Sequence, residues 1–251
     1  MVRVIAALVF DLYLGAAAAA MVGGAQVIAR AAERPEVMFV GSRGNFCTGV
    51  AIAPDLILTA AHCVLPGSTY KHVVLDANRQ PVFKDTIGIA LHPKFSIQAL
   101  RAHRATADVA LIKLKERVAA APVRLAAARP RIAVGERFTV VGFGVSVRED
   151  GNTAATLRSA TMAATGKPGS LQLRLVDPIT GGNRPGLGAC TGDSGAPVYQ
   201  DIGGSFAVIG VVSWSTGPAL SDGCGGLTGV TPLELYRGWV IEQATRLGSP
   251  L

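Results

Sequence analysis

The sequence is poor in charged residues, which make up 16% of its 251 residues, and in aromatic residues, which make up 6%. Disordered chains are highly charged and poor in apolar residues. Because 49% of the residues here are hydrophobic, the composition excludes a disordered chain. The length allows a sizeable core in one large domain or two small ones. The 30 glycines and 14 prolines predict many turns, which suits an all-β protein of short strands better than a helical bundle.

Dense basic runs are also missing. The net charge is +7, from 24 Lys and Arg against 17 Asp and Glu, but the arginines are scattered and no aromatic stacking motif accompanies them. We therefore expect a basic, solvated surface and no nucleic-acid partner. A weak preference for anionic surfaces remains the alternative.

Metal-binding patterns are absent as well. The four histidines show no zinc spacing, and Asp76, Asn78 and Asp85 lack the ligand spacing of a calcium loop. The sequence predicts neither a metal nor a cofactor.

No clean apolar run of about 20 residues is present, as a membrane span would need. Residues 1–20 carry Arg3, run apolar with an interruption at Asp11, and end in Ala16–Ala20. This composition predicts a secretory signal peptide with an Ala-x-Ala cleavage site, and hence a secreted or periplasmic protein without stable membrane insertion. An uncleaved anchor is the alternative.

Cysteine is scarce, but the four residues form an even number. In an exported chain they predict two disulfides, for which three connectivities exist. Free buried thiols are the alternative.

Strand-like runs recur along the chain, separated by turn signals. They are Val37–Val40, Gly49–Ile52, Leu56–Thr59, His72–Leu75, Ala110–Leu114, Arg137–Gly142, Leu157–Met162, Leu171–Val176, Ala196–Tyr199, Ala207–Ser213 and Gly229–Thr231. An Ala-, Arg- and Pro-rich stretch at Ala119–Arg131 predicts a linker between two halves. After Pro232 the apolar spacing becomes helical, which predicts a helix that packs on the second half; an interfacial membrane helix is the alternative.

Three short motifs carry the residue types of a nucleophilic catalyst: Thr59–Cys63 (TAAHC), Asp108–Leu114 (DVALIKL) and Gly192–Pro197 (GDSGAP). A serine hydroxyl is a poor nucleophile at neutral pH, so it needs a base, and the base needs an orienting partner. The glycines around Ser194 suggest a backbone bent to present one hydroxyl and its neighbouring N–H groups.

With these motifs in this order, the chain resembles the chymotrypsin-like (trypsin-fold) serine proteases, and among them a secreted, bacterial-type member. The resemblance implies an all-β fold of two six-stranded antiparallel Greek-key barrels, an active site in the cleft between them, and a C-terminal α-helix. After a signal peptide at 1–20, we expect a protease domain at 21–251. Its parts are barrel 1 at about 21–125, barrel 2 at about 126–232 and the helix at about 233–247.

The resemblance also implies the mechanism. Ser194 attacks the scissile carbonyl to form an acyl-enzyme, His62 serves as general base and then acid, and Asp108 orients the imidazole. The backbone N–H groups of Gly192 and Ser194 are expected to form the oxyanion hole.

Two further pairings follow from the resemblance. One is the disulfide framework, Cys47–Cys63 and Cys190–Cys224. The other is an activation ion pair between the carboxylate of Asp193 and a new α-amine at Met21. Because Met21 directly follows the alanine run, we expect signal-peptide cleavage to release that amine without a separate pro-peptide.

The resemblance assigns substrate binding to Gly188, Ala189, Ser213, Trp214, Ser215 and Gly229. The hydroxyl of Ser213 is also expected to meet Asp108. No residue at the expected pocket base or walls is acidic or bulky, so we predict an apolar, medium to large side chain before the scissile bond. Asp222 near the rim keeps a basic preference open.

Together these inferences predict a secreted serine endopeptidase, a monomer that acts on peptides or proteins and takes protein inhibitors as further partners. The alternatives are a non-catalytic binding protein on the same fold, since fold alone does not fix function, and an esterase. Turnover of a peptide substrate separates the first from an enzyme, and comparison of amide with ester hydrolysis separates the second.

Overall fold

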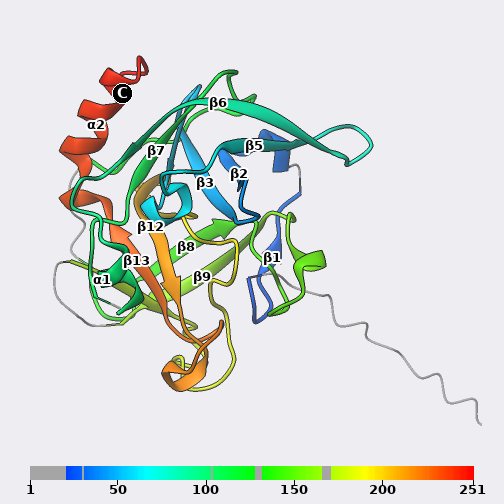
Figure 1. The fold of residues 1–251 in the computed structure, drawn as a ribbon. Helices are drawn as coiled ribbons and strands as arrows, with labels where there is room; N and C mark the ends of the chain where they lie inside the picture. The colour runs from blue at the N-terminus through cyan, green and yellow to red at the C-terminus, as the bar shows by residue number, and fades with distance from the viewer. Residues whose placement is uncertain (1–20, 30, 103, 128–131, 166–170) are drawn as a thin grey trace, which may run out of the picture.

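The computed structural model describes residues 21–29, 31–102, 104–127, 132–165 and 171–251. The expected signal peptide lies outside these residues, as does the end of the expected linker. The described chain is mostly β and forms two closed six-stranded antiparallel barrels, as predicted (Figure 1).

The first barrel closes in the order β2-β3-β4-β7-β6-β5. Its strands are β2 (Glu36–Gly41), β3 (Phe46–Ala53), β4 (Leu56–Thr59), β5 (Tyr70–Leu75), β6 (Pro81–Leu91) and β7 (Ala110–Leu114). β4 is buried along its whole length, and its sequence is accordingly a short apolar run bounded by turn residues.

Strand β6 was not predicted. Its 11 residues are exposed or half-buried and include Lys84 and Asp85, so no apolar run marks it. It forms because it pairs with β5 on one side and β7 on the other. Asp76 lies in the turn that joins β5 to β6, where its carboxylate accepts the N–H groups of Asn78 and Gln80, both at 2.8 Å.

The second barrel closes through pairing of β8 with both β9 and β11. Its strands are β8 (Arg137–Gly142), β9 (Arg158–Ala164), β10 (Leu173–Val176), β11 (Pro197–Ile202), β12 (Ser205–Ser215) and β13 (Thr228–Pro232), and β1 (Gln26–Val27) is added beside β9. The expected linker lies between the two barrels, after β7 and before β8.

The α-helices of the described residues are few and short. They are α1 (Ile97–Arg101), which was not predicted, and α2 (Arg237–Arg246), which follows a 3₁₀ turn at Leu233–Leu235. Within the described residues, none of the helices has the length and apolar character needed to cross a membrane.

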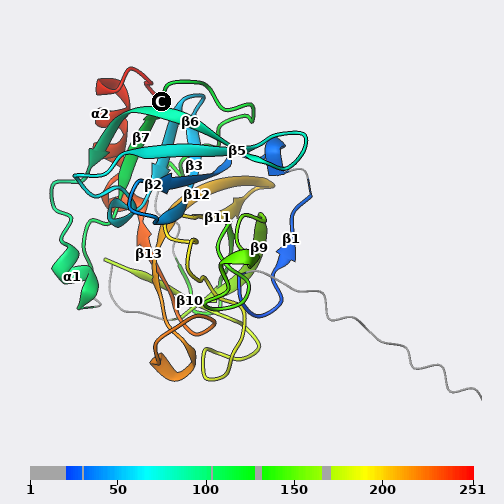
Figure 2. The ribbon, with the colours of Figure 1, turned by 45° about the vertical axis from the view of Figure 1, so that its right-hand side comes forward.

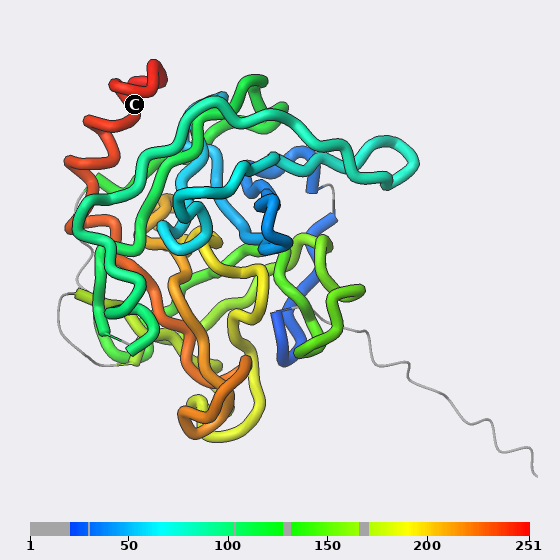
Figure 3. The backbone as a smooth tube through the Cα atoms, in the orientation of Figure 1, coloured from blue at the N-terminus to red at the C-terminus, as the bar shows by residue number. Residues whose placement is uncertain are grey.

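Helix α2 packs on the first barrel, which corrects the expectation that it would pack on the second. Val240 is buried in one cluster with Leu111 of β7. Just beyond the helix, Leu247 lies against Gly88 of β6. Figure 2 shows α2 beside β6 and β7, and Figure 3 follows the chain from the second barrel back to the first. The apolar spacing of a helix shows that one face is buried, but not which barrel covers that face.

The barrels also share a core. One cluster of buried side chains draws from both barrels and from α2; it includes Val50, Leu58, Val109, Val141, Val211 and Val240. Two motif residues bond across this junction: Asp108 of the first barrel to Ser213 of β12, and Gly192 of the second barrel to Thr48 of β3.

Candidate active site

His62 and Asp108 are joined by two hydrogen bonds on the first barrel. His62 lies in a 3₁₀ turn, Ala61–Val64, directly after β4, and Asp108 precedes β7, the strand that pairs with β4. The Nδ1 atom of His62 lies 2.8 Å from Oδ2 of Asp108, and the backbone N–H of His62 donates to Oδ1 at 2.9 Å. Because the carboxylate accepts, Nδ1 carries the proton in the neutral ring and Nε2 is left as an acceptor.

A third donor completes the surroundings of Asp108. The hydroxyl of Ser213 donates to Oδ2 at 2.5 Å from β12 of the second barrel. Asp108 has no exposed surface, and Ser213 is 5% exposed. Three donors hold this buried carboxylate in one orientation.

Ser194 lies in the loop before β11, and it lines a cavity of about 530 Å³ together with His62. The first barrel contributes Phe46 to this cavity, and the second contributes Gly192 and Ser215. Among the described residues no hydrogen bond joins Oγ of Ser194 to Nε2 of His62. Nucleophile–base contacts are often loose without substrate and tighten in the complex.

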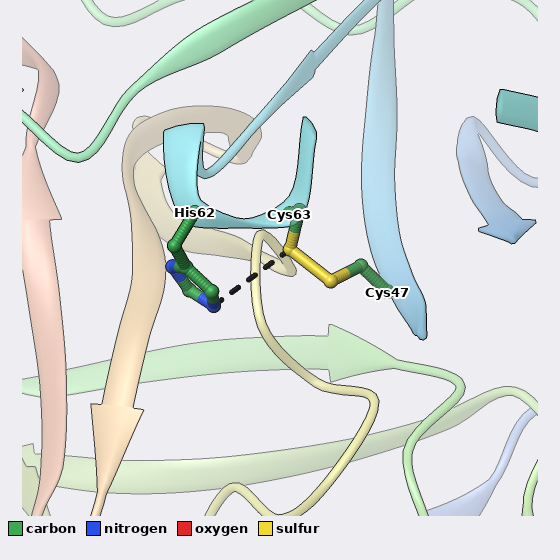
Figure 4. A group of neighbouring side chains, drawn as sticks. All are labelled: Cys47, His62 and Cys63. Carbon is green, nitrogen blue, oxygen red and sulfur yellow. Dashed lines mark hydrogen bonds between the residues drawn. A yellow bond between two sulfur atoms is a disulfide. The ribbon is translucent and has the colours of Figure 1, made fainter. Parts of the chain in front are cut away.

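Both disulfides implied by the resemblance are present, Cys47–Cys63 and Cys190–Cys224. Figure 4 shows the first beside His62, whose Nε2 lies 3.8 Å from Sγ of Cys63. The potential ligand atoms of Cys47, His62 and Cys63 lie within 4.8 Å of one another, but the two sulfurs are bonded to each other. They are therefore not thiolates, and this group does not fit a metal ion.

The backbone around Ser194 is shaped by two glycines with positive φ, Gly192 at +93° and Gly195 at +78°. A Cβ on Gly192 would lie 2.0 Å from the ring of Phe46, and one on Gly195 would lie 2.0 Å from Oγ1 of Thr59. Only glycine fits either position. Among the described residues, no hydrogen bond is donated by the N–H of Gly192 or of Ser194.

The trypsin domain family matches residues 22–240 of this chain. The chain belongs to the trypsin family. It is similar to a vitellin-degrading protease of Bombyx mori, with 27% identity over 244 residues that cover 90% of this chain and 86% of the relative. This trypsin-family chain is a serine-type endopeptidase, and peptides or proteins are its substrates.

Asp193, the neighbour of Ser194, is fully buried. Its Oδ1 accepts the N–H of Gly144 and its Oδ2 the N–H of Cys190, both at 2.9 Å. Burial raises the pKa of Asp193 to about 7, although these two N–H groups and the charge of Arg158 favour the carboxylate. A buried carboxylate of this kind would be stabilised by a cationic partner.

The segment that begins at Met21 is docked against the second barrel. Met21 has no exposed surface and belongs to that barrel's core, and Val22 forms an antiparallel bridge with Gly188. In the uncut chain the nitrogen of Met21 is a neutral amide. The predicted ion pair with Asp193 therefore requires cleavage before Met21.

Ser215 is the one predicted substrate-binding residue that lines the described cavity with Ser194. It pairs across the sheet with Thr228, which has no exposed surface. The N–H of Ala189 donates to Oγ1 of Thr228 at 3.0 Å, so this side chain spans from β13 to the segment before Cys190.

Gly229 stands in register with Trp214, one residue beyond the position opposite Ser215. A Cβ on Gly229 would lie 2.1 Å from the Trp214 ring, which also faces the guanidinium of Arg174 at 5.6 Å. The Cα of Gly229 therefore packs against an indole ring, and its expected role in substrate binding stays a prediction. Gly188, expected at the pocket base, lies against the backbone of Gly225.

Sequence reasoning missed several residues of this region. Phe46 lines the cavity, and so do Arg148 and Glu149, which form an exposed ion pair at 3.4 Å on its rim. The signal that could have revealed Phe46 is its place next to Cys47, which the resemblance pairs with Cys63 beside His62. Thr48 and Thr228 carry no signal at all, because a threonine in a strand is ordinary.

Proposed function

We propose that the chain cleaves peptide bonds through an acyl-enzyme on Ser194. Oγ attacks the carbonyl carbon while its proton moves to Nε2 of His62, and the N–H groups of Gly192 and Ser194 stabilise the oxyanion. His62 then protonates the leaving nitrogen as the C–N bond breaks. Water, deprotonated by His62, releases the acyl group. Asp108 fixes the imidazole throughout.

One observation carries this proposal. The buried Asp108 holds His62 through both its side chain and its backbone, and it accepts a third bond from Ser213, while His62 and Ser194 face one cavity. A network of this kind leaves the free nitrogen of His62 as a base toward that cavity.

For maturation, we propose export with cleavage after Ala20. The segment that begins at Met21 already packs against the second barrel in the uncut chain. After cleavage, the new amine at Met21 forms an ion pair with Asp193. A secreted or periplasmic monomer of bacterial type, with protein inhibitors as further partners, completes this proposal. The two disulfides support an oxidising compartment.

For specificity, we propose an apolar residue before the scissile bond, and a small one in place of the medium to large one expected from the sequence. Thr228 supports this proposal, because it pairs with Ser215 and binds the N–H of Ala189, two residues that the resemblance assigns to substrate binding. Substrates with Ala or Val at this position should be cleaved faster than those with Phe. The variant Thr228→Gly should shift the preference toward Phe, and faster cleavage after Lys or Arg would instead implicate Asp222.

The test of the catalytic proposal is intact mass spectrometry of the exported protein before and after a fluorophosphonate probe. We expect a chain that starts at Met21 and gains one adduct, and no adduct on Ser194→Ala. A correctly cleaved, disulfide-bonded chain that gains no adduct and hydrolyses no peptide would favour a binding protein. Hydrolysis of esters without amides would favour an esterase.

A further inference from the structure

Thr48 of β3 lies at the junction of the two barrels with no exposed surface. Its hydroxyl donates to the carbonyl oxygen of Gly192 at 2.8 Å, across a sequence separation of 144 residues. The hydroxyl oxygen of Thr48 in turn accepts the N–H of Phe143 at 3.0 Å. One buried hydroxyl thus links the first barrel to two loops of the second.

The backbone of Thr48 makes two further hydrogen bonds, one to the second barrel and one within the first. Its N–H donates to the carbonyl of Ser194 at 3.0 Å, and its own carbonyl accepts the hydroxyl of Thr59 at 2.9 Å. Thr48 therefore binds both residues whose N–H groups are proposed to hold the oxyanion. No other side chain of the described residues donates to the carbonyl of either.

The peptide unit between Gly192 and Asp193 is fixed at both ends as a result. Thr48 holds its carbonyl, and its N–H donates to the carbonyl of Cys190 at 2.9 Å. Gly192 has a positive φ and no side chain, so without these bonds its backbone would have unusual freedom.

The loop after β8 supports the same segment from the other side. The N–H of Phe143 meets the Thr48 hydroxyl, that of Gly144 meets Asp193, and that of Val145 donates to the carbonyl of Thr191 at 2.9 Å. Three consecutive N–H groups thus hold the stretch from residue 191 to residue 193. Those of Gly144 and Val145 bind it directly, whereas that of Phe143 binds the Thr48 hydroxyl, which in turn binds Gly192.

We infer that Thr48 is a positioning residue of the oxyanion hole: its hydroxyl fixes the peptide unit between Gly192 and Asp193, and through the Cα of Gly192 this keeps the preceding N–H, that of Gly192, pointed at the developing negative charge. This inference rests on the proposed function. The alternative is a purely structural hydroxyl that only joins the barrels. Valine has the shape of threonine, so Thr48→Val removes the hydroxyl, keeps the volume, and separates the two explanations.

The experiment compares the mature wild type with Thr48→Val, Thr48→Ser and Thr86→Val. Thr86 is the matched control, because its hydroxyl also donates to a backbone carbonyl, that of Tyr70 at 2.9 Å, in the same barrel but outside the site. For each protein, kcat and KM for a peptide amide are measured. Binding is measured for a peptide boronate, which places a negative oxygen in the hole, and for the corresponding product carboxylate.

We expect Thr48→Val to lower kcat about 10- to 100-fold with little change in KM, since loss of a whole oxyanion donor costs about 100- to 1000-fold. Boronate affinity should fall in parallel while product affinity stays the same. Thr48→Ser should restore most of the loss, and Thr86→Val should match the wild type. If Thr48→Val does not fold, Thr48→Ala takes its place.

A Thr48→Val protein with wild-type kcat and boronate affinity would overturn the inference and leave the proposed function intact. An equal fall of kcat in Thr48→Val and Thr86→Val would also overturn it in favour of a structural role. So would a rise of KM in Thr48→Val as large as its fall in kcat. A wild type without peptide hydrolysis or probe labelling would overturn the proposed function itself.

Discussion

The two barrels supply their halves of the candidate site in different ways. On the first barrel, His62 and Asp108 lie at the ends of neighbouring strands, and direct bonds between them fix their geometry. On the second, Ser194 lies in a loop, and its position depends on partners elsewhere: Asp193 bonded to Gly144, and Thr48 bonded to Gly192. The first half is thus held by direct bonds in the uncut chain, whereas the second contains a buried carboxylate for which the described residues show no ion pair within bonding distance, only the more distant charge of Arg158.

The largest expected effect tests the first half. Asp108→Asn should lower kcat for a peptide amide about 10⁴-fold, because an amide in place of the carboxylate favours the wrong imidazole tautomer. Steady-state kinetics measures the effect, with circular dichroism as a check on the fold. A loss below about 10-fold would show that the bond to Asp108 does not set the state of His62.

The second prediction tests the second half through pH. Asp193 has an ordinary pKa of 3.8, which burial raises to about 7 in the uncut fold. The folded state therefore favours the protonated carboxyl, and its contribution to stability is fully present below about pH 4 and lost as pH rises to about 7. The expected loss is at most about 4 kcal/mol in the free energy of unfolding.

Urea unfolding of the uncut Ser194→Ala chain, with and without Asp193→Asn, measures this loss as a difference. His72 has a pKa that burial lowers to about 4, so it destabilises the fold as pH falls, but both proteins share it. In the chain cut before Met21 the ammonium should reverse the slope of the Asp193 contribution. If the free energies of unfolding of the two uncut proteins changed with pH in the same way, the prediction would be wrong.

The third prediction compares the disulfides. Cys190–Cys224 joins residues 34 apart, and Cys47–Cys63 joins residues 16 apart. From loop-closure entropy, double alanine replacement should cost about 4 kcal/mol at the first and about 3 kcal/mol at the second. Denaturant unfolding of both variants measures the costs. A larger cost at Cys47–Cys63 would mean that native packing around His62 outweighs chain entropy.

The smallest effect concerns the bond that joins the two halves. Ser213→Ala removes one of three donors to Asp108, and both bonds from His62 remain. We expect kcat to fall about 10- to 150-fold with KM nearly unchanged, as one hydrogen bond to a charged group is worth about 1.5–3 kcal/mol. Ser213→Thr, which keeps the hydroxyl, should retain more activity than Ser213→Ala. An equal loss in both would point to packing.

The sequence allowed prediction of the parts whose signal is local. β4, β7 and β8 have the predicted bounds because each is an apolar run between turn residues. The two disulfide pairings were correctly implied by the resemblance. The proximity of His62 to Asp108 was implied in the same way.

The rest depends on contacts between distant segments. β6 is half-buried and carries charge, so only its pairing with β5 and β7 reveals it. The apolar positions of α2 predict that one face of the helix is buried, but they do not predict which barrel covers that face. The one-residue offset that places Thr228 opposite Ser215 follows a register shift between Val212 and Trp214, and no composition marks such a shift.

The return of the chain to the first barrel has a consequence for its synthesis. Near the C-terminus, Ser249 donates to Asp55 at 2.5 Å, and Lys113 donates to the same carboxylate at 2.8 Å. A ribosome delivers the first barrel early, but the residues of α2 and beyond that cover β6 and β7 emerge only after the whole second barrel. We expect the amino-terminal half to wait with an uncovered apolar face until α2 has been made, so that a chain truncated before α2 aggregates.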